Sequence, residues 1–231
     1  MLLAGCVDRV AVIWPDEDSG MWELDEHRHY TGSKIAVWTA FDRAVRLAEE
    51  GQLPDRHVRQ WREQRERLHN WIEEHAWSDE LGAYRGRAGE EKLDAAVLRA
   101  ARQGWPEEER LRHTVDAIRE QLGAAPGLIY RTSEHAGEEG AFVACSFWIA
   151  EALARLGRVD EACDGMEQVL PHANDLGLFS EQIDPGGGEL LGNFPQGLSH
   201  LALINAAGAI QDADRRRRDA GASATGGEAR G

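Results

Sequence analysis

The sequence has little cysteine and no long apolar run. Its three cysteines, Cys6, Cys145 and Cys163, are too few and too scattered for a disulfide framework or a zinc site. We therefore expect a reducing, cytoplasmic compartment. The apolar runs all fall short of the ~18 residues that a membrane span requires, so no membrane partner is expected.

Basic residues are also in the minority. The chain has 26 Lys and Arg against 41 Asp and Glu, which gives a formal charge of −15. Nucleic acids and anionic membranes are bound by basic surfaces, so neither is an expected partner. Hydrophobic residues make up 42% and charged residues 29% of the 231 positions. This composition is ordinary for a globular protein and excludes wholesale disorder.

Strand patterns are lacking, and helical patterns recur between short breaks at Gly and Pro. Ser33 is the expected N-cap of one helix, Asp94 opens another, and Gly51 and Gly157 are expected stops. The helices are expected over residues 2–13, 33–50, 55–76, 94–101, 106–122, 139–156, 159–172 and 195–210. Residues 211–231, which include four consecutive arginines and then mostly small residues, are expected to form a disordered tail.

The expected helices alternate in kind along the chain. Segments that are apolar nearly all round, and therefore expected to be buried, cover residues 35–41, 95–101, 141–154 and 198–207. Helices with charged outer faces lie between them. This alternation is typical of two concentric helix layers, so the predicted fold class is all-α, an α/α toroid or solenoid.

Three polar, Gly-rich loops precede apolar helices. They cover residues 18–23, 128–142 and 178–196. Functional groups in helical toroids tend to lie on loops at one rim, so we expect all three loops at the mouth of one ring. In the region of the first loop, His27 and His29 with Glu26 could suggest a metal site. A His-x-His pair on a loop lacks a defined third ligand, however, and HExxH is absent. We expect no metal and no cofactor.

Motifs in these loops and helices resemble the glucoamylase-type glycoside hydrolases, family fifteen, in its bacterial glucoamylase and trehalase branch. The resemblance covers roughly residues 1–210. The motifs, in the family's order, are Gly20-Met21-Trp22-Glu23, Ser33-Lys34 with Asp42-Arg43-Ala44, Leu93-Asp94-Ala95, Glu139-Gly140-Ala141-Phe142 with Ser146-Phe147-Trp148, Asn174-Asp175-Leu176-Gly177-Leu178 with Ser180-Glu181, and Gly192-Asn193-Phe194-Pro195-Gln196 with Ser199-His200.

The resemblance implies a ring of six inner and six outer helices. This chain looks like its later part, about eight of the twelve helices, which gives an incomplete (α/α)6 toroid over residues 1–210. The early helices and an N-terminal β-sandwich of the family have no counterpart in the sequence. We therefore expect self-association or a missing N-terminal half.

The resemblance also implies two catalytic glutamates. Hydrolysis with inversion requires an acid that protonates the leaving oxygen and a carboxylate that activates water, ~6.5–9.5 Å apart. In the family the Glu of the Trp-Glu motif is the acid and the Glu of the Ser-Glu motif is the base, which correspond here to Glu23 and Glu181. Without the resemblance, each of these two glutamates would be interpreted as one more solvated carboxylate of an acidic chain.

Substrate-binding roles are expected for Trp22, Arg131 and Glu139. Trp22 either stacks on a sugar ring or only lines the pocket. Arg131 matches a sugar-binding arginine of the family. Alternatively, it forms only a salt bridge at the surface. Glu139 either binds sugar or sits at a helix start, where a carboxylate is favourable.

The function expected from these residues is inverting hydrolysis of terminal α-glucosidic bonds in trehalose, in small α-glucosides or at α-glucan ends. The expected partner is a small carbohydrate. Two alternatives stay open: a truncated, inactive toroid remnant that binds sugar or a partner chain, and a helical scaffold in which both glutamates are incidental.

Overall fold

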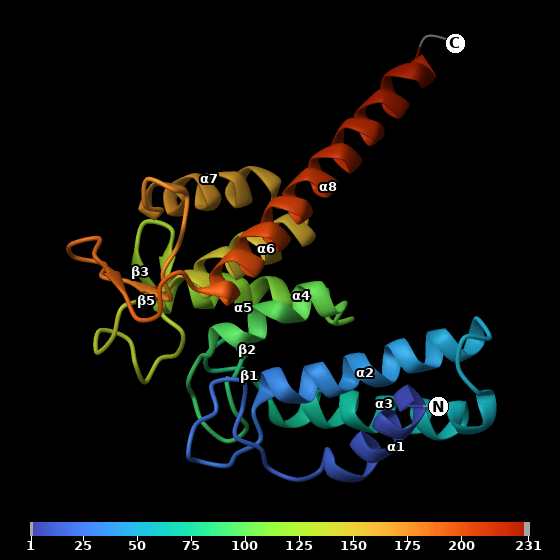
Figure 1. Cartoon of the computed structure of the whole chain (residues 1–231). Coiled ribbons are helices and arrows are strands. Elements are labelled where there is room, and N and C mark those ends of the chain that lie inside the picture. Colours follow the sequence, from blue (N-terminus) through green and yellow to red (C-terminus); the bar gives the residue numbers. More distant parts are fainter. Residues whose placement is uncertain (1, 229–231) are drawn as a thin grey trace. The chain divides into compact units, whose positions relative to one another are not determined.

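The computed structural model describes the backbone of residues 2–228 and the side chains of residues 2–220. The chain divides into two compact units, Met1–Ala117 and Ile118–Gly231. Each unit is described by itself below, with the element labels of Figure 1.

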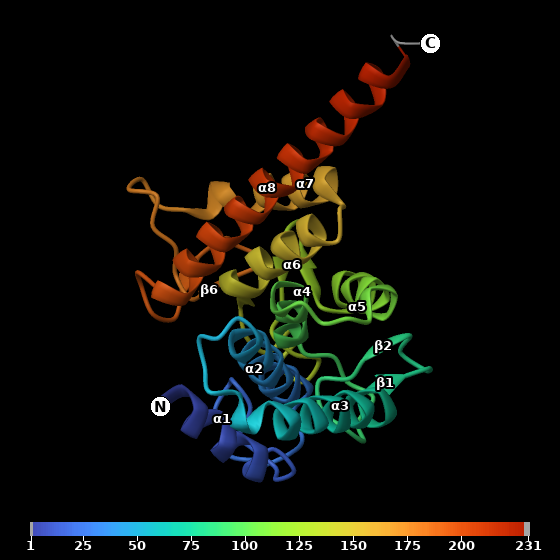
Figure 2. The ribbon, with the colours of Figure 1, turned by 90° about the vertical axis from the view of Figure 1, so that its right-hand side faces the viewer.

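Unit 1 is built on helices α1 (Leu2–Ile13), α2 (Thr31–Glu49) and α3 (Val58–His75), the last preceded by a 3-10 turn at Asp55–His57. Helices α2 and α3 lie side by side, and α1 packs on both (Figure 1, Figure 2). Trp61, Leu68 and Ile72 recur at helical spacing on α3 and are fully buried. The apolar stripe of an amphipathic helix thus faces the core, as the sequence predicted.

The remainder of unit 1 consists of a short hairpin, a 3-10 helix that continues into a short α-helix, and the first part of a longer helix. Its elements are β1 (Trp77–Ser78), β2 (Ala83–Tyr84), a 3-10 helix at Ala95–Arg99, α4 (Ala100–Gln103) and the first part of α5 (Glu108–Gln121). The Asp94 carboxylate accepts a hydrogen bond of 2.7 Å from the Ala96 N–H. The prediction that Asp94 caps this helix is therefore confirmed.

Unit 2 is built around the buried helix α6. Its elements are β3 (Gly123–Ala125), β4 (Leu128–Ile129), β5 (Ala141–Phe142), α6 (Val143–Arg155), α7 (Val159–Val169) with a 3-10 turn at Leu170–His172, β6 (Gln182–Ile183), β7 (Leu190–Leu191) and α8 (Gly197–Glu228). Every residue from Val143 to Ala154 is buried, and α7 and α8 pack on α6 (Figure 2).

Strands are minor elements of both units. They form antiparallel pairs β1–β2 and β3–β4 and a three-stranded sheet β5–β6–β7. The longest strand, β3, has three residues. The predicted all-α class is confirmed.

Most expected helix bounds agree with the structure, and α2 differs at its start. It begins at Thr31 rather than after a Ser33 cap, because the Thr31 N–H donates to the Gly86 carbonyl. The Ser33 hydroxyl instead donates to Asp18 at 2.7 Å. The expected stops are confirmed, since Gly51 and Gly157 follow helix ends with φ of 74° and 80°.

The expected start of α6 at Glu139 is wrong. Residues Ala141 and Phe142 pair instead with Ile183 and Gln182 as strand β5, and the helix begins at Val143. Pairing with a distant strand is a tertiary contact that local periodicity does not reveal. Glu139 therefore lies in the loop before β5.

The last helix is longer than expected. Helix α8 continues past Ile210 to Glu228, which differs from the disordered tail predicted for residues 211–231; residues 229–231 lie outside the described part. Ion pairs accompany the continuation: Arg218 with Asp214 one turn earlier (2.6 Å), and Arg217 with Asp160 of α7 (2.8 Å). The Asp214–Arg218 pair, at i,i+4 spacing, stabilises the helix itself, and the Arg217–Asp160 pair joins it to α7.

The expectation that residues 198–207 are buried all round is also wrong. Small residues, among them Ala202 and Ala206, face α6, while Leu201 and Ile204 are 60% and 66% exposed. In unit 1, the exposed apolar side chains of α1 are Leu2, Leu3, Val12 and Ile13. Each unit therefore presents an apolar helix face to solvent.

Exposed apolar faces predict self-association, because clustered apolar side chains favour burial against another surface. We expect the chain to form oligomers whose fraction rises with concentration. Leu201→Glu combined with Ile204→Glu should raise the monomer fraction in light scattering after gel filtration. Gln211→Glu, an exposed polar position of the same helix, is the control. A monomeric wild-type chain at all concentrations would refute this expectation.

An ion-pair network ties the last turn of α5 to α7 within unit 2. Arg158 makes two hydrogen bonds of 2.7 Å to the Glu161 carboxylate, and Arg119 makes a third. The Arg158 bonds, helped by Arg119, lower the pKa of Glu161 to about 2. The Glu161 side chain is 42% exposed, so solvent screening reduces the contribution to stability.

The sign of the pH effect follows from the lowered pKa. A carboxyl whose pKa is lower in the folded than in the unfolded state stabilises the fold above its ordinary pKa, and loses this effect as pH falls. Glu161→Gln should therefore lower Tm at neutral pH, and its difference from wild type should shrink between pH 4.5 and about 2. Glu167→Gln, at an exposed position of α7, is the control. A Tm difference independent of pH would contradict the account.

Candidate active site

The loop between α1 and α2 is closed on itself in unit 1. Asp18 and Arg28 exchange two backbone hydrogen bonds of 2.9 Å. The Asp18 carboxylate accepts hydrogen bonds from the Gly20 N–H at 2.8 Å and from the Ser33 hydroxyl. Gly20 has a φ of 66°, and a Cβ there would lie 2.9 Å from the Tyr30 ring. These contacts define one conformation for residues 18–28, which we call the acid loop.

Glu23 lies at the tip of the acid loop with a φ of 52°. Among residues 2–228, it is the one non-glycine residue with a positive φ. A non-glycine residue in the left-handed region costs roughly 1–3 kcal/mol, and such residues gather at functional sites. The Glu23 side chain is exposed.

Trp22 is held by Asp94, the residue that caps the 3-10 helix Ala95–Arg99. Its indole N–H donates to both Asp94 oxygens, at 2.9 and 3.0 Å. A Cβ on Gly86 would lie 2.6 Å from Asp94 Cβ, so glycine is required where this chain segment approaches. The sequence predicted the Asp94 cap but not its second role as the acceptor for Trp22.

A small cavity lies beside the acid loop. Its volume is about 150 Å³, and Met21, Tyr30, Ser33, Asp94 and Arg99 are among its lining residues. Ligand pockets usually measure about 300–1,000 Å³. The cavity is therefore a recess of unit 1 smaller than an ordinary ligand site.

In unit 2, strand pairing joins the second and third polar loops. The Val143 N–H donates to the Glu181 carbonyl at 3.1 Å, next to the β5–β6 pair. This contact brings the segment after Arg131 together with the segment that carries Glu181. Within unit 2, these two of the three loops therefore lie together, while their common position with the first loop stays a prediction.

The Glu181 carboxylate is held by Asn193. Its Oε2 accepts hydrogen bonds of 3.0 Å from both the backbone N–H and the side-chain amide of Asn193. The Glu181 N–H in turn donates to the Asn193 carbonyl at 2.9 Å. Gly192 has a φ of 71°, and a Cβ there would lie 2.7 Å from Glu181 Oε2. Residues 192–193 are thus shaped around this carboxylate.

Arg131 and Glu139 pair with each other. The Arg131 Nε donates to Glu139 Oε1 at 2.6 Å, with both side chains 18% exposed. The guanidinium also lies 5.0 Å from the centre of the Phe142 ring. The reading of Glu139 as a helix-start carboxylate is wrong, since α6 begins four residues later. The partly buried pair also differs from the surface salt bridge considered for Arg131.

The predicted site residues thus fall into two groups. Trp22 and Glu23 belong to unit 1, whereas Arg131, Glu139 and Glu181 belong to unit 2. Sequence reasoning missed the contacts of Asn193 and Lys34, although both lie in motifs that carried the resemblance. In the described part of the chain, no three His, Cys, Asp or Glu side chains are grouped to hold a metal ion. None of the described helices has the length and apolarity to cross a membrane.

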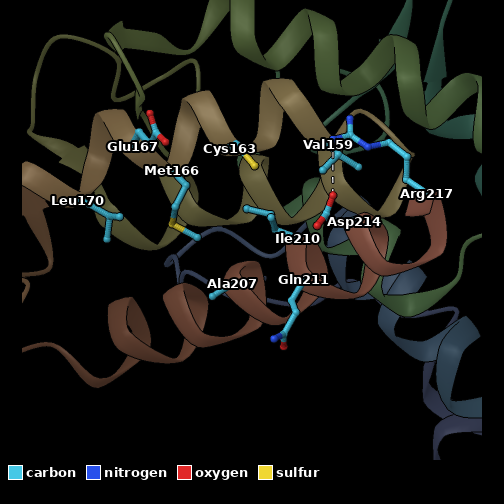
Figure 3. Close-up of a pocket in the computed structure, with 10 residues that line it drawn as sticks. All are labelled: Val159, Cys163, Met166, Glu167, Leu170, Ala207, Ile210, Gln211, Asp214 and Arg217. Carbon is cyan, nitrogen blue, oxygen red and sulfur yellow. Dashed lines mark ion pairs between the residues drawn. The ribbon is translucent and has the colours of Figure 1, made fainter. Parts of the chain in front are cut away.

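A second cavity, of about 500 Å³, lies between α7 and α8 (Figure 3). Its walls are mainly apolar, with Cys163 and Met166 on α7 and Ile210 on α8. Asp214 at one end pairs with Arg217 and Arg218. None of the predicted site residues lines this groove, so it is not the candidate active site.

Sequence comparison identifies one family and several relatives. The family model described as "Glycosyl hydrolases family 15" matches residues 3–164 and 158–208. A trehalase of Mycobacterium tuberculosis is 40% identical over 202 residues, which is 84% of this chain and 29% of that protein. A trehalase of Mycolicibacterium smegmatis is 38% identical over 89% of this chain and 32% of its own length. The chain thus spans about a third of these relatives.

Solved structures of other proteins are similar to this chain in fold. The family 15 glucoamylase from Hypocrea jecorina matches with a TM-score of 0.73 at 12% identity, over 90% of this chain and 46% of that one. A bacterial glucoamylase complexed with acarbose matches with a TM-score of 0.76 at 15% identity, over 91% of this chain and 37% of that one. The predicted class, all-α and part of an (α/α)6 toroid, is confirmed.

Proposed function

Because this chain belongs to family 15 of the glycosyl hydrolases, we propose that it carries the catalytic acid and base of an inverting glycosidase. Glu23 protonates the leaving glycosidic oxygen, and Glu181 deprotonates the water that attacks the anomeric carbon from the opposite face. Protonation and attack together cleave a terminal α-glucosidic bond and release glucose with inverted configuration.

The observation that carries this proposal is the backbone of Glu23. Glycine would adopt a φ of 52° without strain, yet glutamate stands there, at the tip of a loop closed by Asp18 and Arg28. Strain of this kind persists only where the surroundings enforce it. A carboxylate held at such a position is well suited to a role in catalysis.

Glu181 is supported by a different feature. Two hydrogen bonds on Oε2 from Asn193 fix the carboxylate plane. A base that activates water must present one oxygen in a defined direction. We propose that Oε2 anchors the group and that Oε1 accepts the proton from water.

We propose trehalose as the substrate, with maltose and α-glucan ends as alternatives. Both relatives described above are named trehalases, whereas the solved structures include glucoamylases. Trp22 supplies an aromatic face for a sugar ring, and the Arg131–Glu139 pair presents oriented polar groups to sugar hydroxyls. The rates of glucose release from trehalose and from maltose test this preference for trehalose. Faster release from maltose would make maltose the preferred substrate.

A second candidate function is a non-catalytic toroid module. It is favoured by the exposed Leu201 and Ile204 on α8. Glucose release by this chain alone would exclude the module. Release only after extension with further family helices would show that the two glutamates require those helices.

A further inference from the structure

One of the chain's two lysines is buried. Lys34 lies in the first turn of α2 and is 2% exposed, while the side chain of Lys92 is 44% exposed. Burying an ammonium group is costly unless it is paired and hydrogen-bonded. The contacts of Lys34 therefore indicate why a lysine stands at this position.

The Lys34 ammonium is directed at the segment that precedes Glu23. It donates hydrogen bonds to the carbonyl oxygens of Trp14 at 2.8 Å and Asp16 at 2.7 Å, and it lies 3.7 Å from Asp18 Oδ2. Burial lowers the pKa of Lys34, and the Asp18 carboxylate opposes that shift. The three contacts hold the chain immediately before the acid loop against α2.

Asp18 extends this connection into the acid loop. Its Oδ1 accepts from the Gly20 N–H and the Ser33 hydroxyl, while its backbone pairs with Arg28 at the far end of the loop. The ammonium is thus linked, through the carboxylate and backbone of Asp18, to both ends of the segment that carries Glu23.

We propose that Lys34 is a positioning residue for the general acid: its ammonium locks residues 14–18 onto α2 and thereby fixes the strained backbone of Glu23. This rests on the proposed role of Glu23. A purely packing role would be served as well by methionine, because the indole ring of Trp71 lies 5.9 Å from the ammonium and the core side of α2 is largely apolar.

The test compares Lys34→Met with Lys92→Met. Both variants remove one positive charge from unit 1, and only the first removes the lock. Hydrogen exchange is followed by mass spectrometry in peptides covering residues 15–29 and, as an internal reference, α3. A hydrogen bond to a charged group contributes enough that its loss should speed exchange in residues 15–29 at least about tenfold, with α3 unchanged. Lys92→Met should match wild type.

Trypsin and a milder variant add independent measurements. Cleavage after Arg28, whose side chain is 44% exposed, should be faster in Lys34→Met if the loop opens. Asp18→Asn keeps the size of the side chain and weakens the same connection, so it should give an intermediate effect. It also keeps the test decisive if Lys34→Met does not fold.

Kinetic measurements distinguish a positioning role of Lys34 from a purely stabilising one. Turnover of trehalose should fall at least about tenfold in Lys34→Met, with KM little changed, since a displaced acid impairs chemistry more than binding. Unchanged exchange in residues 15–29, equally faster exchange in α3, or an open loop with normal kcat would each overturn the proposal. If neither wild type nor the chain extended with further family helices releases glucose, the proposed function fails, and the exchange data alone decide whether Lys34 fixes the acid loop.

Discussion

Replacing Glu23 by Gln is expected to lower turnover of trehalose by about 10²–10⁴-fold, the usual contribution of a general acid. Glutamine has nearly the same size but no proton to donate to the leaving oxygen. The decline of the rate on the alkaline side, which reports deprotonation of the acid, should disappear. The loss should be smaller for glucosyl fluoride, whose leaving group needs little protonation. Steady-state kinetics on both substrates measure the effect.

Two further variants control the Glu23 experiment. Asp25→Asn makes the same charge change at an exposed position of the same loop and should retain activity. Glu23→Gly should be inactive yet no less stable than wild type, because glycine tolerates a φ of 52°. Near-normal turnover of Glu23→Gln, or a large drop in Tm for Glu23→Gly, would remove Glu23 from its assigned role.

Replacing Glu181 by Gln is expected to lower turnover by a similar factor, but for every substrate, activated ones included. The base acts on water, so an improved leaving group does not replace it. The side-chain carbonyl of the introduced glutamine can still accept hydrogen bonds from Asn193, so the loop should keep its shape. Azide, a nucleophile that needs no deprotonation, should restore part of the turnover of glucosyl fluoride by attacking the anomeric carbon as fluoride departs.

The control for this experiment is Glu189→Gln, at an exposed position between β6 and β7. It should behave as wild type in every assay. A Glu181→Gln variant that hydrolyses glucosyl fluoride normally without azide would contradict the role of Glu181 as base.

Helices were predictable where local periodicity and packing agree. In α3, Trp61, Leu68 and Ile72 lie on one face and are fully buried, so the sequence pattern predicts both the helix and its core side. The start of α6 was not predictable, because Ala141 and Phe142 pair with a strand about 40 residues away. The exposed Leu201 and Ile204 show that apolar sequence alone does not determine which face is covered.

The candidate site was predictable at the level of motifs. Glu23 and Glu181 were identified by resemblance, and no periodicity distinguishes them from the other carboxylates of an acidic chain. The left-handed backbone of Glu23 and the Asn193 bonds to Glu181 depend on distant contacts. The same holds for the Lys34 lock, which joins residues 14–18 to α2 through backbone carbonyls that carry no sequence signal.

The expectation that Glu23 and Glu181 face each other across one pocket stays a prediction, since they belong to different units. A carboxyl separation of about 6.5–9.5 Å would fit inversion, and one of about 5 Å would indicate a retaining mechanism. Stereochemistry reports this arrangement without a measured distance.

The anomer released first from trehalose therefore tests the central claim most directly. Proton NMR of a fresh reaction resolves the anomers before they interconvert. Inversion by the Glu23–Glu181 pair predicts equal initial amounts of β-glucose, from the attacked ring, and α-glucose, from the leaving group. Initial formation of α-glucose alone would show retention. The absence of any glucose from both this chain and the chain extended with further family helices, under conditions where both are folded, would contradict the proposed activity.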